Sequence, residues 1–308
     1  MKIVMYGSPL GAGGAMTEIP FLLNGKIERI YKDAVDLQDL EADIAIANFT
    51  RDPLNSGNET GWNYVRLPKV KVQLAIQAEH WDEYICEWVD GITHNFDGSI
   101  IFPFNAPFWN FDTSRHEVFS RETWIAKNAP IKPFFTFDPL VKWNGFYQGP
   151  ITKFGDYGCA MGSTTIHRER VVKNNNQIRH LFGDVRDLNL QNALKESGIG
   201  INIHKFQIKG KCPETNKLEI KYVPKTESIR LAFFYNLGMA VVSEELDDTF
   251  PERLKNCIEI VEDMEKYQID KDYLLLQTLE TKKVFNEYHD LETEFDNLIT
   301  AIVKEYNL

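Results

Sequence analysis

Short apolar runs that alternate with helix-like segments constrain the fold of this chain more than any other feature. The first run, Lys2–Tyr6, is followed at once by the glycine-rich stretch GSPLGAGGAM. Asp43–Asn48 and Val72–Gln77 are two more runs of the length and character of buried parallel strands. A strand, a glycine-rich loop and a helix form the opening of a nucleotide-binding type of α/β unit. We therefore expect an α/β fold with parallel sheets covered by helices.

The same alternation resumes in the second half, after a proline- and aromatic-rich stretch over 102–149 that we interpret as a linker. Strands are predicted there at Tyr157–Met161, Ile178–Phe182, Ile199–His204 and Met239–Ser243, and helices around Arg168, at Leu188–Ser197, Thr226–Leu237, Glu252–Tyr267 and over most of Asp270–Lys304. The pattern predicts two Rossmann-like domains, 1–135 and 136–285, followed by a helical acidic segment, 286–308.

Length and charge set further bounds. The chain has 308 residues, enough for two domains. Its net charge of −11 arises entirely in 244–308, with 18 Asp/Glu and 7 Lys/Arg, so the rest of the chain is neutral and an anionic partner is not excluded. No apolar run approaches the ~20 residues of a membrane span. The first run is too short for a signal peptide, so we expect a cytoplasmic protein.

Several site classes are disfavoured by spacing. The four cysteines form no CxxC pair, which argues against a zinc site and a disulfide framework. The first glycine-rich stretch carries Gly11, Gly13 and Gly14, but Met16 stands where a dinucleotide fingerprint needs glycine, and no P-loop lysine follows. We interpret these glycines either as a tight turn or as a loop that a ligand, here the acceptor, approaches.

The segment PKTESIRLAFFYNLGMAVVSEEL, residues 224–246, carries the strongest chemical signal. Thr226 marks a helix start and Gly238 its end, and a strand then runs to Ser243. A helix N-terminus at the carboxyl edge of a parallel sheet is suited to bind an anion. Arg230 lies one turn into that helix, where its guanidinium could bind a diphosphate bidentately.

This segment resembles the C-terminal-domain signature of GT-B-type glycosyltransferases, which runs roughly R-x-x-E-A-x-A-x-G-x-x-V-V-x-x. Arg230, Gly238, Val241 and Val242 match it in register, whereas Phe233 stands at the position of the family's ribose-binding glutamate. The resemblance implies that the final acidic helix packs back across two facing domains. It leaves Glu227 and Glu244 as candidates for contacts to the donor nucleoside or sugar.

Two upstream features agree with this resemblance. Gly162-Ser163 followed by Arg168 and Arg170 resembles the glycine-serine turn and arginine-bearing helix of GT-B enzymes, including the DNA glucosyltransferases of T-even phages. The strand that ends in Asn-x-His resembles the one before the donor loop and implies a donor contact for His204. The resemblance covers about 154–245. It implies a metal-independent transfer from a UDP- or GDP-linked sugar, with no other cofactor, in which Gly162, Ser163, Arg168, Arg170 and Arg230 bind the diphosphate.

An inverting transferase also needs a group that accepts the acceptor's proton. Glu79 and, second, Asp82 follow a predicted strand of the first domain, although Asp82 could equally cap a helix. Asp270-Lys271-Asp272 is the one Asp-x-Asp motif, and we interpret it as a helical surface and not as the metal motif of GT-A enzymes.

The sequence leaves two classes of acceptor open. We expect a glycan or another small or cell-surface hydroxyl acceptor, and the alternative is a modified DNA base, for which Arg66, Lys69 and Lys71 would lie near the cleft. A non-catalytic nucleotide- or sugar-binding α/β protein is the competing hypothesis of another class.

Overall fold

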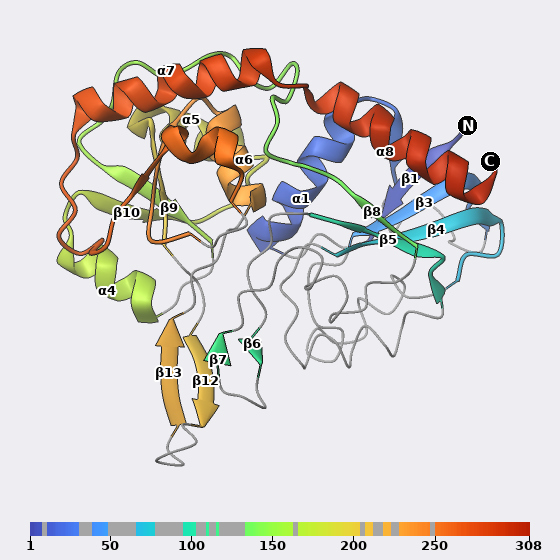
Figure 1. The fold of residues 1–308 in the computed structure, drawn as a ribbon, viewed down its shortest axis with the longest axis horizontal. Coiled ribbons are helices and arrows are strands. Elements are labelled where there is room, and N and C mark those ends of the chain that lie inside the picture. The colour runs from blue at the N-terminus through green and yellow to red at the C-terminus, as the bar shows by residue number, and fades with distance from the viewer. Residues whose placement is uncertain are drawn as a thin grey trace.

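Two parallel sheets and their flanking helices make up the computed structural model (Figure 1). Its described residues are 1–7, 11–30, 39–48, 66–77, 95–102, 109–110, 115–116, 133–162, 166–203, 207–211, 218–222, 228–246 and 250–308. The expected α/β class with parallel sheets is confirmed. In these ranges, no helix is long and apolar enough to cross a membrane.

The first sheet has six parallel strands in the order β2-β1-β3-β4-β5-β8. They are β1 (Ile3–Tyr6), β2 (Ile27–Arg29), β3 (Ala42–Asn48), β4 (Val70–Gln77), β5 (Gly98–Ile101) and β8 (Phe134–Thr136). Every residue of β1 and β5 is buried, which explains why these strands are continuous apolar or small-residue runs without a polar face.

The second sheet has five parallel strands in the order β10-β9-β11-β14-β15. They are β9 (Gly158–Met161), β10 (Ile178–Leu181), β11 (Ile199–Asn202), β14 (Ala240–Ser243) and β15 (Ile258–Ile260). Counted along the chain, both sheets begin 2-1-3-4-5. Strand order therefore reverses between β1 and β3 and again between β9 and β11, and such reversal points at the carboxyl ends of strands are where open α/β sheets bind ligands.

Helices connect and cover these strands. They are α1 (Gly11–Leu23), α4 (Ile166–Asn174), α5 (Leu188–Ser197), α6 (Ser228–Asn236), the 3-10 helix η5 (Glu252–Cys257), α7 (Lys271–Glu287) and α8 (Leu291–Tyr306). Two antiparallel hairpins complete the description: β6 (Trp109–Asn110) with β7 (Arg115–His116), and β12 (Gln207–Lys211) with β13 (Leu218–Tyr222).

One hydrophobic cluster runs from the first sheet to the second. Helix α1 contacts α6, and the Phe21 ring of α1 stacks on Phe137 at 4.5 Å between centroids. The Phe146 ring packs on the Phe233 ring of α6, with 6.0 Å between the ring centroids. The sheets are therefore joined by a shared core as well as by the chain.

Helix α8 returns to the first sheet (Figure 1). The Tyr306 hydroxyl donates to the Asp97 carbonyl at 2.8 Å, and its ring packs on Phe135 of β8. Near the start of α8, Glu294 accepts a hydrogen bond from the Asp138 backbone N–H at 2.7 Å. The predicted domain boundary after residue 135 falls inside β8, and the division of the chain into domains stays a prediction.

The prediction of a helix over Glu252–Tyr267 is wrong. Its first part is the short 3-10 helix η5, and Ile258–Ile260 form β15, which pairs with β14. Leu254, Cys257 and Ile258 are buried at a spacing that also fits a helix, and only the long-range pairing with β14 distinguishes the two structures.

Candidate functional site

Four side chains and one glycine meet where the order of the second sheet reverses. Gly162 directly follows β9 and Asn202 ends β11, while α4 contributes Arg168 and α6 contributes Arg230. His180 of β10 completes the group. Parallel strands place their carboxyl ends at one edge of the sheet, so Gly162 and Arg230 meet here although they are 68 positions apart in the chain.

Arg168 is fully buried, at 0% exposure. Its Nε and Nη2 donate to the carbonyl oxygen of Ile203, at 3.0 and 2.7 Å, just after β11. These two bonds orient the guanidinium plane and leave Nη1 directed at Gly162. The end of β11 thus positions the cation on α4.

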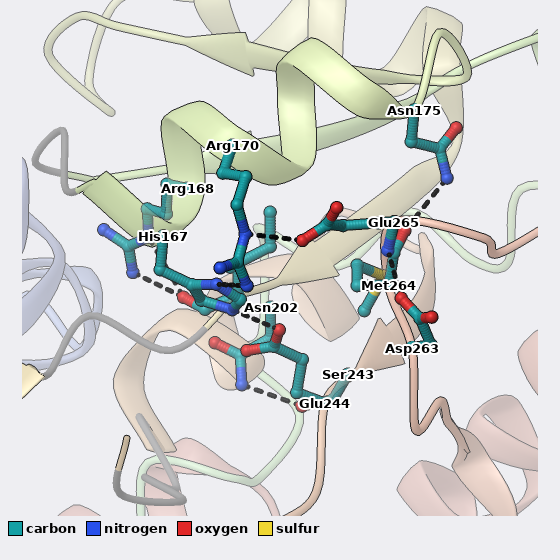
Figure 2. Close-up of polar contacts among 11 residues, drawn as sticks. His167, Arg168, Arg170, Asn175, Asn202, Ser243, Glu244, Asp263, Met264 and Glu265 are labelled. Carbon is teal, nitrogen blue, oxygen red and sulfur yellow. Dashed lines mark hydrogen bonds and ion pairs between the residues drawn. The ribbon is translucent and has the colours of Figure 1, made fainter. Parts of the chain in front are cut away.

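Arg230 is almost as deeply buried, at 5% exposure. Its Nη1 donates to the Asn202 Oδ1 at 3.1 Å, and the Asn202 amide donates in turn to the Ser243 Oγ at 2.9 Å. Figure 2 shows Asn202 and Ser243 joined between the ends of β11 and β14. This relay holds Arg230 from two neighbouring strands.

Gly162 is where the two guanidinium groups converge. A Cβ atom at this position would lie 2.8 Å from Arg230 Nη2 and 2.9 Å from Arg168 Nη1. Gly162 also has φ of +110°, which side-chain-bearing residues rarely adopt. Two buried cations in one place repel each other and are costly to desolvate, so an anion bound here would stabilise the arrangement.

His180 of β10 contacts the backbone of Gly162. Burial lowers the pKa of His180 below its ordinary value, and the nearby Arg168 and Arg230 charges lower it further, against an opposing hydrogen bond to Gly162. The ring is therefore neutral near pH 7, and its Nε2–H donates to the Gly162 carbonyl at 2.9 Å. The Phe182 ring contacts His180 at 4.2 Å between centroids and is 65% exposed.

A second set of contacts joins α4 to the segments that follow β14 and β15 (Figure 2). His167 Nε2 lies 2.5 Å from Glu244 Oε1, directly after β14. Arg170 Nε pairs with Glu265 Oε1 at 2.6 Å, and the Arg170 side chain is 53% exposed. Arg170 thus binds a surface carboxylate and is not held by the Ile203 or Asn202 groups that position Arg168 and Arg230.

The structure brings three of the predicted diphosphate residues together, namely Gly162, Arg168 and Arg230. Glu244 lies at the same sheet edge, in contact with α4. Other predicted site residues lie outside the described residues: Glu79, Asp82, Ser163, His204 and Glu227. The sequence GAGGAM is not a loop, because α1 begins at Gly11 and so includes Gly11, Gly13 and Gly14; their contact with an acceptor stays a prediction.

Sequence reasoning missed Asn202, Ser243 and His180. The polar residues at the ends of β11 and β14 gave a signal, because a buried strand that ends in Asn or Ser presents a polar group at the ligand-binding edge. The structure also places Phe233, whose side chain is fully buried in the core against Phe146.

The reversal point of the first sheet holds a buried ion pair. Glu18 of α1 and Arg29 of β2 lie 2.9 Å apart, with side chains 1% and 7% exposed. Burial raises the pKa of Glu18, while Arg29, Asn48 and the Arg186 charge from the β10–α5 loop lower it. Arg29 Nη2 also donates to the Gly7 carbonyl at 2.6 Å, so the pair fixes the end of β1.

The three basic residues predicted near the cleft lie at the amino edge of the first sheet, opposite to its carboxyl edge. Arg66, Lys69 and Lys71 flank the start of β4, the amino edge, whereas ligand-binding edges are carboxyl edges. Each pairs with a carboxylate: Arg66 with Asp97 at 2.5 Å, Lys69 with Asp39 at 2.8 Å and Lys71 with Asp43 at 2.6 Å. Their placement gives no support to a DNA acceptor.

Among the described residues, no group of three or more His, Cys, Asp or Glu side chains could hold a metal ion. No protein-family model matches the sequence, and no curated protein is significantly similar to it.

Proposed function

We propose that this protein is a GT-B-type glycosyltransferase, with two Rossmann-like domains, that transfers a sugar from a nucleotide-sugar donor to an acceptor hydroxyl without a metal ion. The observation that carries the proposal is the convergence of Arg168 and Arg230 on Gly162 at the strand-order reversal of the second sheet. The resemblance of 154–245 to donor-binding domains points to the same residues.

The proposed chemistry follows from the charges. As the bond between sugar and diphosphate breaks, negative charge grows on the departing nucleoside diphosphate. Two guanidinium groups that are already buried and oriented stabilise this charge with little reorganisation. The neutral His180 adds no further positive charge and instead anchors the carbonyl of Gly162.

The donor's ribose needs a hydrogen-bond acceptor that Phe233 cannot supply. We propose Glu244 for this contact, because its carboxylate lies at the carboxyl end of β14 and is oriented by His167. Glu227 and His204 are the further candidates. Glu79 or Asp82 would accept the proton of the acceptor, a glycan or another small hydroxyl compound.

The test is a thermal-shift panel of UDP, GDP, CMP and ADP sugars, followed by donor hydrolysis. A donor at 1,000 times its Kd adds about 4 kcal/mol to the free energy of unfolding, so a true donor will stand out. Arg230→Ala should lose both the shift and the hydrolysis, whereas Arg170→Ala, which removes an exposed arginine of α4, should keep them.

Two outcomes would count against the proposal. If no nucleotide or nucleotide sugar shifts the midpoint, the site does not bind a donor. If a nucleotide binds at Arg230 but no nucleotide sugar is ever hydrolysed or transferred, the protein is instead a non-catalytic binding protein.

A further inference from the structure

Helix α7 has an inner side that packs on β14, β15 and η5 and an outer side that is exposed. The side chains that it buries recur at helical spacing: Leu274, Gln277, Thr278, Thr281 and Phe285. The outer side carries Tyr273, Leu276 and Leu279, which are 46%, 65% and 45% exposed. Three large apolar side chains on one helix face are typical of a surface that another helix covers.

Four residues follow the outer side of α7 along the helix axis: Asp272, Leu276, Leu279 and Lys283. Their spacing of four, three and four positions is that of the a and d positions of a coiled coil, the seam along which one helix packs on another. We call these four residues the outer seam. It has two leucines in the middle, an acidic residue at its amino end and a basic residue at its carboxyl end.

This order of side chains is complementary to itself when two copies of α7 run antiparallel. With a two-fold axis midway between Leu276 and Leu279, Leu276 faces the partner's Leu279, and Asp272 faces the partner's Lys283. Each contact then occurs twice, as two-fold symmetry requires. A parallel pair would instead bring Asp272 against its own copy and Lys283 against its own copy. The outer seam therefore selects an antiparallel partner of the same sequence.

The charges on α7 also permit a second copy. The helix contains three lysines and three acidic residues, so it is neutral although residues 244–308 as a whole carry a balance of −11. The Lys283 ammonium lies 3.4 Å from Glu280 of its own helix, and its side chain is 59% exposed. Because an ammonium has three donors, Lys283 can bind a second carboxylate across the seam.

Pairing through α7 does not cover the candidate site. The helix begins near the amino edge of the second sheet, where Lys271 pairs with Asp156, two residues before β9, at 2.7 Å. It then runs along the outer edge of the molecule (Figure 1). Gly162 and its two arginines lie at the carboxyl edge of the same sheet.

We propose that the outer seam of α7 is the interface of a symmetric homodimer, in which the two α7 helices pack antiparallel. The seam spans about 16 Å at ~1.5 Å per residue. An interface of this length suits a reversible dimer of the weak, transient class. The inference goes beyond the proposed transferase function and does not depend on it.

Sedimentation equilibrium tests the proposal by measuring the mass of the protein from low micromolar to several hundred micromolar concentration. The wild type should pass from monomer to dimer in this range. Leu276→Asp places a carboxylate opposite a leucine twice per dimer and should raise the dissociation constant by about 100-fold or more. The matched control is Leu188→Asp, which adds the same charge at a leucine of α5 that is 71% exposed, and it should dimerise like the wild type.

A charge exchange tests the antiparallel arrangement. Asp272→Lys or Lys283→Asp alone turns two attractive contacts into two repulsive ones and should weaken the dimer about 5- to 30-fold. The double variant D272K/K283D restores both pairs and should dimerise to within about threefold of the wild type. A parallel pair would gain nothing from this exchange. Circular dichroism and urea unfolding check the folding of every variant.

Three results would overturn the inference. The first is a wild type that stays monomeric at the highest concentration, which would leave the outer side of α7 to a different protein. The second is equal weakening by Leu276→Asp and Leu188→Asp. The third is a double charge exchange that dimerises no better than the single variants.

Discussion

Substitution of Gly162 by alanine tests the core of the proposed site. The new Cβ would lie 2.8 Å from Arg230 Nη2 and 2.9 Å from Arg168 Nη1, closer than Cβ atoms normally approach other atoms. Arg168 cannot easily retreat, because two of its nitrogens are bonded to the Ile203 carbonyl and its side chain is fully buried. The substitution therefore displaces at least one guanidinium from its place beside Gly162.

The expected magnitude has two parts. A φ of +110° is unfavourable for alanine, and such strain costs about 1–3 kcal/mol of folding free energy. A hydrogen bond to a charged group is worth about 1.5–3 kcal/mol, so the loss of one guanidinium–phosphate bond should weaken nucleotide binding roughly 10- to 150-fold. Ligand affinity should thus fall in addition to stability.

The assay combines urea unfolding with calorimetric titration of the nucleotide that scores in the thermal-shift panel. Gly25→Ala is the matched control, because Gly25 has φ of +68° and its added Cβ would meet nothing within 4 Å. The control should lose about 1–2 kcal/mol of stability and keep the nucleotide affinity. Wild-type affinity in Gly162→Ala would refute the assignment of the site, and an equal affinity loss in Gly25→Ala would refute the reasoning about its cause.

Two further predictions concern stability. In Gly238→Ala the new Cβ would clash with the Gly149 carbonyl oxygen, and the residue would keep a φ of +78°, so the free energy of unfolding in urea should fall by about 2–5 kcal/mol. Gly145→Ala is the control, because Gly145 has the same φ and open space around the added Cβ, and it should lose only about 1–2 kcal/mol. Equal losses in the two variants would contradict the clash. The pKa of His180 is lowered from 6.5 in the folded protein, so the unfolded chain binds a proton that the folded protein refuses, and the free energy of unfolding should fall as pH drops through and below about 6.5. His180→Gln should flatten that part of the pH profile in urea unfolding, and an unchanged profile would contradict the reasoning.

Much of the fold could be predicted from local patterns. The strand β3 and the helix α5 appear within one residue of their predicted ends, because buried parallel strands are continuous apolar runs and α5 has both an Asp187 cap and Gly198 at its end. The region of η5 and β15 could not be predicted, because its structure depends on pairing with β14 over a long sequence distance.

The candidate site was predictable in part for the same reason. Arg230 and Arg168 each follow a recognisable local pattern, and Asn202 ends a buried strand. The hydrogen bonds of Asn202 to Arg230 and of His180 to Gly162 nevertheless form only when the strands assemble at one edge. The wrong placement of Lys71 was avoidable in principle. A residue that opens a parallel strand lies at the amino edge, so the predicted strand already excluded it from the carboxyl edge.

The two chain segments that pass between the sheets are bonded to each other where they cross. Lys142 in the first and Asp290 in the second form a parallel bridge, the Leu291 N–H donates to the Lys142 carbonyl at 2.9 Å, and the Asn144 amide donates to Asp290 at 2.5 Å. In mechanical terms, these bonds make the crossing a fixed point between the two connections. A hinge motion of one sheet relative to the other could turn about this crossing, whereas a sliding motion would have to break its hydrogen bonds.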